Sequence, residues 1–537
     1  MAGWRVVALG LGALVLIAAF GSAIWFSAGS SSAGVAEIVV DSVGDGADPT
    51  PGNGDCDDGA GNCTLRAAIE TANGVPGTDT IVFDIDGDGP HTITPASPLP
   101  EITDPVVIDG YSQPGASANT LGPKEGTDAV LRIEIDGSNA GPDADGLVVN
   151  GGDSTVSGLV INRFGGSGIL LDDGIGNLIE TRNRVQGNFL GTDVDGEVAL
   201  GNGTGVTVRN SWWGLIGGFS PEHNNLISGN GIGIELTGNT MLVNVQGSII
   251  GAARDGDAPL PNDSHGVLLS DGALCNTIGS EQVEGENIIA YNGGHAVAMT
   301  DGVGVNNYVD PNEMHSNGGM GIDLGDDGVT PNDLDDLDSG PNDLQNFPII
   351  TSAETSDPPG SIVIKGTLDT RPGKFVNAFF FSNTECDPSG NGEGRTYLGK
   401  TVFSTGPDGD VLIDVSLPFE VQPGAFITST VSSPESTSEF SPCFVATSSD
   451  AVRLQGDVDC DDDIDAVDGL GQLRHVAGFE VNQQPGCPVV GSEFASLFGD
   501  VDCDDDVDSV DALKVLRHLV GFSVAQNEPC ANIATPL

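Results

Sequence analysis

A short apolar phrase recurs along the middle of the chain. Each copy begins with Gly or Ala and continues with an aliphatic residue, one further residue and a second apolar residue. These phrases are too short for helices and are bounded by Gly and Asn, so each predicts a strand that ends in a turn. Their spacing of 22 to 37 residues is typical of solenoid repeats. The copies begin at Gly146, Gly168, Gly205, Gly233, Gly266, Ala296 and Gly321.

A second repeat favours the same architecture. The segment 191–202 has a near copy in 251–262, at an offset of 60 residues or about two coils. Asn-Gly pairs precede several strands, and both residue types tolerate the positive φ of a tight turn. Together these patterns predict a mainly β chain in which residues 146–325 form a parallel β-solenoid (β-helix) with alternate aliphatic side chains in its core. The pairs begin at Asn230, Asn292 and Asn317.

The segments on either side of the solenoid have patterns of their own. Residues 37–145 are the predicted entry, with strands at 80–84, 91–94 and 106–109 and a helix over 64–73. In that helix the apolar residues share one face and Thr64 is the expected N-cap, so it can cover the first open coil. After an acidic linker at 326–348, alternating strands over 349–447 predict an Ig-like β-sandwich, either a spacer or a binding module.

The most specific chemical pattern is an acidic dodecamer that occurs twice, 43 residues apart, within 454–533. Carboxylates at loop positions 1, 3, 5, 9 and 12, with the carbonyl at position 7, supply the oxygen ligands that surround Ca²⁺. So much like charge in twelve residues is unfavourable without a cation. We therefore expect two Ca²⁺ ions, held by Asp457, Asp459, Asp461, Asp463, Asp465 and Asp468 and by Asp500, Asp502, Asp504, Asp506, Asp508 and Asp511.

A helix is expected after each loop, because apolar residues recur at helical spacing from Val467 and from Val510. Gly478 and Gly521 stand where each helix should end, since Gly accepts the left-handed C-cap conformation. An apolar residue at loop position 8, Ile464 in the first loop, is expected in a small core between the loops.

Composition and the N-terminus indicate an extracellular protein. Residues 6–26 form an uncharged apolar run behind Arg5, which predicts a secretion signal within 1–36 or, if it is retained, a membrane anchor. The formal charge of −60 makes nucleic acid and anionic lipid poor partners, so membrane contact is expected only through an uncleaved N-terminus.

Nine cysteines are consistent with that oxidising environment. Cys56 with Cys63, and Cys386 with Cys443, are the expected disulfides of the entry and the sandwich. In the C-terminal repeats Cys460 and Cys487, and Cys503 and Cys530, stand 27 residues apart, which suggests one disulfide per repeat, although four cysteines allow three connectivities. Cys275 remains as a buried thiol.

Two stretches resemble known families. Cys63-Thr-Leu-Arg-Ala-Ala-Ile69 is similar to the motif of the CSLREA domain, found at the N-terminus of secreted bacterial β-helix proteins, and this resemblance implies a right-handed, pectate-lyase-like helix. The duplicated loops and helices resemble a type I dockerin, which implies calcium-dependent docking onto a cohesin-like protein or cell-surface scaffold. The dockerin positions that meet the partner correspond to Ala466-Val467 and Ser509-Val510.

Two functions remain open. The first is a secreted, non-catalytic glycan-binding or adhesion protein attached through the dockerin-like module. The alternative is a polysaccharide-degrading enzyme, a glycoside hydrolase or lyase, targeted by that module. Hydrolysis needs two positioned carboxylates and lysis needs a base. The sequence shows no recognisable set of catalytic residues, so these stay unknown. Arg182 and Arg184 could face one groove, and His265 and His295 lie at strand starts. The first function is therefore favoured.

Overall fold

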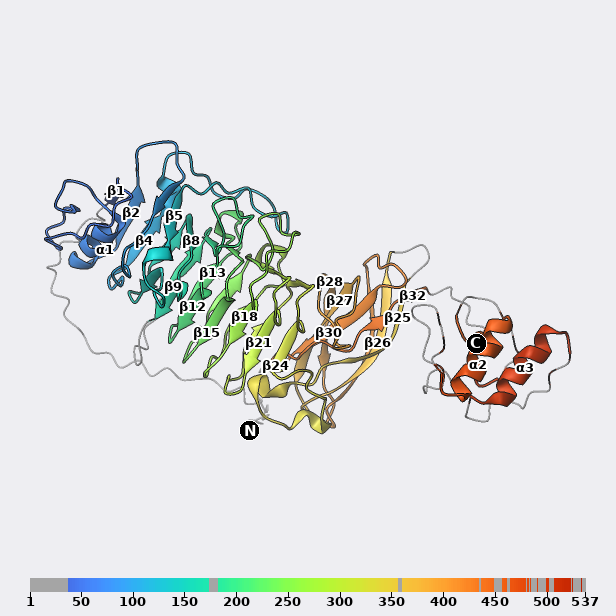
Figure 1. Cartoon of the computed structure of the whole chain (residues 1–537). Helices are drawn as coiled ribbons and strands as arrows, with labels where there is room; N and C mark the ends of the chain where they lie inside the picture. The colour runs from blue at the N-terminus through green and yellow to red at the C-terminus, as the bar shows by residue number, and fades with distance from the viewer. Residues whose placement is uncertain are drawn as a thin grey trace, which may run out of the picture. The chain divides into compact units, whose positions relative to one another are not determined.

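The structure is a computed structural model that describes residues 37–172, 182–355, 360–433, 436–448, 456–460, 464–479, 481, 483, 490, 499–501, 507–522, 524 and 533 (Figure 1). The predicted signal or anchor lies outside these residues. The described elements are mainly strands, with three α-helices: α1 (Leu65–Gly74), α2 (Ala466–Val476) and α3 (Ser509–Leu519). Within the described ranges, none of these helices is long and apolar enough to cross a membrane.

Three parallel sheets form a β-helix from residue 37 to residue 325 (Figure 1). Sheet A contains β1 (Glu37–Val40), β2 (Asp79–Phe83), β4 (Val106–Asp109), β7 (Thr155–Ser157), β10 (Arg184–Gln186), β13 (Leu215–Gly217), β16 (Asn244–Gln246), β19 (Thr277–Ile278) and β22 (Tyr308–Val309). Sheet B contains β3 (His91–Ile93), β5 (Ile133–Asp136), β8 (Leu159–Asn162), β11 (Phe189–Leu190), β14 (Leu226–Ile227), β17 (Ile249–Ile250), β20 (Ile288–Ala290) and β23 (Glu313–His315). Sheet C contains β6 (Leu147–Val149), β9 (Ser167–Asp172), β12 (Thr204–Arg209), β15 (Ile232–Thr237), β18 (Val267–Leu269), β21 (Val297–Thr300) and β24 (Ile322–Gly325).

Sheet C confirms the apolar phrase from which the solenoid was predicted. Its strands coincide, in order, with the seven copies of the phrase. The register stacks equivalent positions directly, so that Ile169, Val206 and Ile234 lie above one another and are fully buried. Such inward side chains of the three sheets form one continuous hydrophobic core.

Asparagine side chains carry the hydrogen bonding between coils through the turns. After sheet B, the backbone N–H of Asn202 donates to Asn230 Oδ1 (3.1 Å), and the N–H of Asn230 donates to Asn262 Oδ1 (2.9 Å). The N–H of Asn292 donates to Asn317 Oδ1 (3.1 Å) in the same ladder. All five side chains are buried, so each amide satisfies turn groups that water cannot reach. Similar ladders link Asn188 to Asn225 and Asn276 to Asn307.

The two copied segments cover the outer face of sheet B. Each is a hairpin, closed by the antiparallel bridge Thr192–Ala199 in one and Ala252–Pro259 in the other. Arg254 joins them, because its guanidinium donates to the carbonyl oxygen of Asp195 (3.2 Å) in the first copy. Beneath the hairpins, outward side chains of sheet B form a second hydrophobic cluster that includes Val160, Phe189, Leu226, Ile249 and Ile288.

Helix α1 lies at the start of the solenoid, as predicted. Thr64 Oγ1 accepts from the N–H of Ala67 (3.1 Å), which is the expected N-cap bond. Leu65 and Ile69 on the inner face of the helix are fully buried in the solenoid core. The helix therefore shields apolar side chains of the first coil from water.

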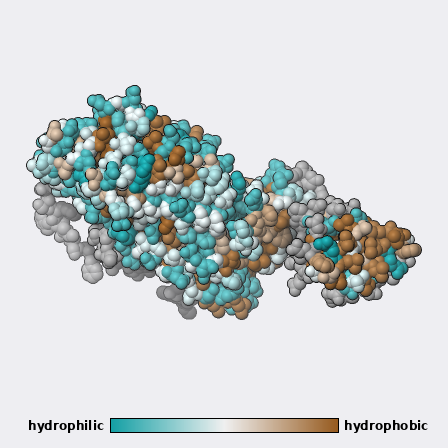
Figure 2. Space-filling model, in the orientation of Figure 1, coloured by the Kyte–Doolittle hydropathy of each residue, from teal (hydrophilic) through white to brown (hydrophobic). Residues whose placement is uncertain are grey.

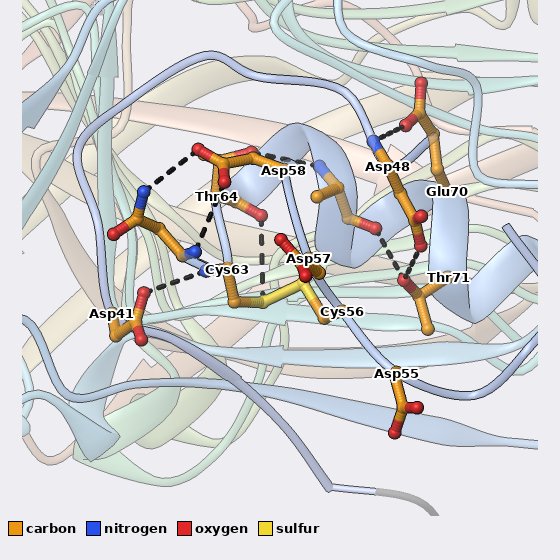
Figure 3. Close-up of a disulfide and its surroundings, with 12 residues drawn as sticks. Asp41, Asp48, Asp55, Cys56, Asp57, Asp58, Cys63, Thr64, Glu70 and Thr71 are labelled. Carbon is orange, nitrogen blue, oxygen red and sulfur yellow. Dashed lines mark hydrogen bonds between the residues drawn. A yellow bond between two sulfur atoms is a disulfide. The ribbon is translucent and has the colours of Figure 1, made fainter. Parts of the chain in front are cut away.

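The predicted disulfide between Cys56 and Cys63 is present beside α1 (Figure 3). Its acidic loop turns back on its own backbone, with Asp57 Oδ1 accepting from the N–H groups of Gly59 (2.8 Å) and Gly61 (2.9 Å). These bonds account for the acidic residues of this loop as turn-formers.

Between residues 349 and 448 the described chain forms two four-stranded sheets. One contains β25 (Ile349–Thr355), β26 (Ile362–Asp369), β29 (Asp410–Leu417) and β32 (Thr447–Ser448). The other contains β27 (Phe375–Asn383), β28 (Thr396–Ser404), β30 (Phe426–Ser432) and β31 (Phe444–Val445). Ile364 and Phe380, one from each sheet, belong to one hydrophobic core, as expected of a sandwich. The predicted disulfide Cys386–Cys443 is present.

The sandwich occupies the open hydrogen-bonding edge of the last coil. Each solenoid sheet donates one N–H to it: Val309 to Thr437 Oγ1 (3.2 Å), Met314 to the Gly394 carbonyl (2.9 Å) and Leu324 to Glu439 Oε1 (3.0 Å). Phe381 and Phe440 of the sandwich join the solenoid core. The module predicted as a spacer or binding domain is therefore also a cap that blocks edge pairing.

The acidic linker is folded between these two parts. Asn342 Oδ1 accepts from the N–H of Asn307 (3.1 Å) and so extends an asparagine ladder beyond the last coil. On the sandwich side, Arg371 pairs with Asp343 at 2.7 Å. The linker thus continues the hydrogen bonding of both neighbours.

The buried Glu439 in this cap predicts that the protein becomes less stable as the pH rises. Burial raises the pKa of Glu439 to about 7, and the charge of Asp323 acts in the same direction, while hydrogen bonds from Leu324 and Thr330 oppose the rise. The folded state then holds a proton that the unfolded chain releases near its ordinary pKa. The unfolding free energy should therefore fall as pH rises from about 4.5 to 7, by up to roughly 3 kcal/mol for this group.

Denaturant unfolding at pH 5 and pH 8 checks this expectation. Glu439→Gln should reduce the difference in unfolding free energy between pH 5 and pH 8, whatever the substitution itself adds to or removes from the stability at both pH values. Glu420→Gln, an exposed position in the same sandwich, is the control and should leave the slope unchanged. If Glu439→Gln left the change of unfolding free energy with pH as it is in the wild type, Glu439 would not be its cause.

Candidate functional site

Helices α2 and α3 begin in the same way, immediately after the two acidic loops. The carboxylate at loop position 9 caps each helix: Asp465 Oδ1 accepts from Val467 N–H and Asp508 Oδ1 from Val510 N–H, both at 2.5 Å. The position-12 carboxylate completes a capping box in each helix. The predicted helices are thus confirmed. Both are followed by glycines with positive φ, Gly478 and Gly521.

The position-12 carboxylates also fold back over the start of their loops. Asp468 Oδ1 accepts from the N–H of Val458, and Asp511 Oδ1 accepts from that of Val501, both at 2.6 Å. Both aspartates are fully buried. This repeated geometry places the last acidic residue of each loop against the first residues of the same loop.

Carboxylate oxygens converge in the first loop. One oxygen from each of Asp457, Asp459 and Asp468 lies within 4.8 Å of the other two. Burial raises the pKa of Asp468 to about 6. Hydrogen bonds from the N–H groups of Asp465, Val458 and Asp459 lower it, and repulsion from the Asp459 carboxylate raises it further. These three carboxylates are close enough together to hold a metal ion, whose charge would offset both burial and repulsion.

Part of the predicted ligand set lies outside the described residues, namely Asp461, Asp463, Asp502, Asp504 and Asp506. The predicted ligands Asp465, Asp500 and Asp508 are described, and Asp500 is buried. Cys460 is disulfide-bonded. The cysteines Cys487, Cys503 and Cys530 also lie outside the described residues, so the connectivity of the repeats stays a prediction. Ile464 packs at a small cluster with Val501 and Val515, as expected for position 8.

Most large apolar side chains of both helices point outward, whereas Val515 of α3 is buried in the small cluster. The buried positions of α2 are Asp468, Gly469, Gly471 and Gln472, whereas Leu470 is 54% exposed; Leu513 of α3 is 55% exposed. Figure 2 shows the resulting brown surface over these helices. We call this surface the helical apolar face; its exposed members are Val467, Leu470, Leu473, Val476, Phe479, Val510, Leu513, Leu516, Leu519, Val520 and Phe522.

Basic residues accompany this face in both repeats. Arg474 and His475 lie in the last turn of α2, and Arg517 and His518 lie at the same place in α3. Their positive charge is favourable at a helix C-terminus. An apolar surface of this extent on a small module, with a basic margin, is typical of a protein-interaction site.

The sequence candidates in the solenoid do not form a catalytic set. Arg184 is exposed on sheet A, and its neighbours in register are Thr155 and Leu215, so no carboxylate stands beside it along that row. Arg182 lies two residues earlier in the turn. Cys275 is half-buried, and burial raises the pKa of its thiol, which disfavours the reactive thiolate.

His265 and His295 form a stacked pair that sequence reasoning did not predict. Their ring centroids are 5.4 Å apart, and His265 Nδ1 accepts from the N–H of His295 (3.2 Å). His295 Nδ1 accepts in turn from Met320 N–H (2.9 Å), and its Nε2 lies 3.3 Å from a carboxylate oxygen of Asp323. A neutral imidazole with Nδ1 as acceptor carries its proton on Nε2, so in this arrangement the rings serve as hydrogen-bonding rungs. One ligand atom from each of His265, His295 and Asp326 nevertheless lies within 4.8 Å of the other two, close enough for the three residues to hold a metal ion.

Comparison with models of known protein families and with curated proteins found no match. Among solved structures, tailspike protein 2 from Escherichia coli O157:H7 bacteriophage CAB120 aligns with 13% identity over 69% of this chain and 60% of that chain, at a TM-score of 0.18. The enzymatically active domain of tailspike protein 4 from bacteriophage CBA120 aligns with 10% identity over 70% and 66%, also at 0.18. The chain thus spans less than two thirds of either neighbour. At such low TM-scores the fold is assigned from the sheets themselves, and no activity is transferred.

Proposed function

We propose that this chain is a secreted or cell-surface, non-catalytic β-helix protein that binds glycan along its solenoid and attaches to a partner protein through a calcium-dependent, dockerin-like module. The observation that carries the proposal is the helical apolar face, which is exposed on two helices whose first turns make the same bonds to Val458 and to Val501 at the start of their loops. The resemblance to CSLREA and dockerin domains supports the same context of secretion and attachment.

Calcium has a defined role in this proposal. Two Ca²⁺ ions would neutralise the aspartates of the loops and hold the start of each loop against its helix. The described support is the convergence of Asp457, Asp459 and Asp468 and the identical backbone bonds at Asp468 and Asp511. Because α2 and α3 each begin at a loop, calcium would also set the orientation of the helical apolar face.

The partner of this face is a protein domain with an apolar surface and an acidic margin. The apolar residues require an apolar partner, and the basic pairs at Arg474 and Arg517 favour negative charge at its edge. A second copy of this chain is a poor occupant, because each copy carries a formal charge of −60. A cohesin-like domain fits the resemblance.

The outer face of sheet A is the proposed glycan surface. Equivalent outward positions of successive coils form a row with polar groups and one cation: Thr155, Arg184, Leu215, Asn244, Thr277 and Tyr308. All are at least partly exposed, and Trp213 (47%) and Phe219 (44%) add exposed rings on the coil of β13. Stacked strands repeat such groups about every 4.8 Å, which suits an extended chain of sugars.

Polysaccharide cleavage remains the alternative function. Hydrolysis needs two carboxylates across the scissile bond. The six positions of this row from Thr155 to Tyr308 contain no Asp or Glu, although the row continues through Val107 and Thr80 to Glu37 in the first coil. Next to Arg184 the row therefore offers no pair of carboxylates and favours binding over cleavage.

Calcium binding is tested by terbium luminescence and calorimetry on the full chain. We expect two sites. Asp500→Ala should abolish one and leave the other, because the loops have separate ligand sets. Circular dichroism should show a loss of helix signal and lower melting of the C-terminal module in excess chelator. An identical helical signal and melting curve in calcium and in chelator would show that the loops do not hold the ion.

The docking face is tested by combining Leu470→Asp with Leu513→Asp. Both side chains are exposed, so the substitution should spare folding and calcium binding yet weaken calcium-dependent capture of type I cohesin domains by more than about tenfold. Leu412→Asp, at a 77% exposed position of the sandwich, is the control. Failure of the wild-type chain to bind any cohesin, together with dimerisation that the double substitution abolishes, would assign the face to self-association.

The solenoid is tested by retention on immobilised glycans with parallel assays for new reducing ends and unsaturated products. We expect retention without product, stronger on neutral xylan than on polygalacturonate or alginate, because the chain is strongly acidic. Arg184→Gln should lower retention severalfold, whereas Lys365→Gln, exposed on the sandwich, should not. Calcium-dependent product formation would instead establish the enzyme alternative.

A further inference from the structure

A polar pocket lies where the last solenoid coil meets the sandwich. Its volume is about 290 Å³, close to the lower end of the range for small-molecule sites, which suits a ligand of one ring. Apart from Pro388, the ring of His315 and the disulfide-bonded Cys386, the side chains that line it are polar or charged. The coil contributes His315, Ser316 and Asn317, and the sandwich contributes Asn383 to Pro388 with Glu393 and Arg395.

The walls of this pocket are fixed by bonds between the two parts. Glu393 Oε1 accepts from the N–H (3.3 Å) and the Nδ2 (2.7 Å) of Asn317, so that it takes the place of the next asparagine in the ladder. Asn383 donates its Nδ2 to the Glu393 carbonyl (3.0 Å) and accepts the N–H of Arg395 (2.8 Å) on Oδ1. The Cys386–Cys443 disulfide closes the sandwich side. The pocket is therefore formed before any ligand binds.

The charged groups in the pocket are incompletely paired. Among the described residues, the guanidinium of the half-buried Arg395 has no ion pair and no hydrogen bond, in a chain with 78 acidic and 18 basic residues. The exposed carboxylate of Glu385 likewise has no described partner. His315 is 5% exposed, and burial lowers its pKa, so that the ring is neutral at pH 7. The walls thus present free donors and free acceptors together.

This lining selects one class of ligand. An apolar molecule finds little apolar wall beyond Pro388, and a simple anion meets the carboxylates of Glu385, Asp387 and Glu393. These three belong to none of the acidic clusters close enough to hold a metal ion among the described residues. Sugar hydroxyls each donate and accept, which matches a mixture of guanidinium, amide, hydroxyl and carboxylate groups. We propose that this pocket binds one terminal sugar residue of a neutral glycan, with Arg395 and Glu385 as direct contacts.

This inference rests on the proposed glycan-binding function and adds a second, end-specific site to the row on sheet A. The experiment uses the full chain, with saturation-transfer NMR and calorimetry on the methyl glycosides of glucose, galactose, mannose, xylose and N-acetylglucosamine. At least one should bind. Arg395→Gln and Glu385→Gln should each weaken that binding by roughly tenfold, which corresponds to the loss of one charged hydrogen bond. Neither side chain makes a hydrogen bond or an ion pair with another described residue, so both variants should fold.

Lys365→Gln and Glu420→Gln, both exposed on the sandwich outside the pocket and outside the row on sheet A, are the matched controls and should leave monosaccharide binding unchanged. Absence of monosaccharide binding while xylan retention persists would overturn the pocket and leave the sheet A proposal intact. Binding that neither pocket variant weakens would also overturn it. If monosaccharides bind and both pocket variants weaken that binding, while no polysaccharide column retains the chain, the pocket proposal is supported. The proposed glycan surface on sheet A is then wrong.

Discussion

The fold depends on one requirement: the backbone N–H and C=O groups of every coil must find partners in the coils on either side. Within the sheets the parallel register meets it, and in the turns the buried asparagine ladders do so. The requirement becomes acute at the last coil, where nothing follows. There the sandwich supplies Thr437, the Gly394 carbonyl and Glu439 to the three sheets, and Glu393 to an asparagine ladder. Because capping needs acceptors in a dry interface, it buries carboxylates, and burial is what raises the pKa of Glu393 and of Glu439 to about 7. Stability of the cap and its sensitivity to pH thus have one cause.

Sequence reasoning succeeded where the pattern was local. The apolar phrase gave sheet C strand by strand, and the helix at 64–73 and those after the acidic loops follow from caps and spacing within a few residues. Sheets A and B were not predicted as sheets, because strands such as Phe189–Leu190 have two residues and no periodicity of their own. Their available signal was asparagine: pairs five residues apart at Asn225 and Asn230, Asn287 and Asn292, and Asn312 and Asn317 bracket sheet B strands. The capping role of the sandwich could not be predicted from local sequence patterns, since it depends on a hydrogen bond between Leu324 and Glu439, which are 115 residues apart.

The candidate site shows why amphipathic spacing alone is ambiguous. The leucines and valines of α2 share a face, and such a face ordinarily packs on a core. Here the interior positions are taken by Gly469, Gly471 and Gln472, and the core of the module is the small cluster around Val501 and Val515. Gly469 lets α2 lie close to Leu516 of α3, and most of the large apolar side chains lie outside the small core. The same spacing therefore describes an exposed apolar face here, and only the three-dimensional arrangement distinguishes it from a face packed on a core. Under the proposed function, docking would depend on calcium, because each helix starts from a loop whose last aspartate is buried.

The scarcity of positive charge adds a physical criterion for function. With 18 basic and 78 acidic residues, an arginine can readily find a carboxylate, and Arg66, Arg163, Arg209 and Arg371 each do so within 2.8 Å. Arg184 on sheet A and Arg395 in the junction pocket have no carboxylate partner in the part of the chain that the structure describes. Leaving a guanidinium unpaired in so acidic a chain forgoes a favourable interaction, so folding alone does not account for these two positions. Both stand on surfaces of hydroxyl and amide groups that match sugars. An acidic solenoid that repels anions at long range can still hold a neutral glycan through such isolated cations, because the contact depends on directed hydrogen bonds and not on net charge.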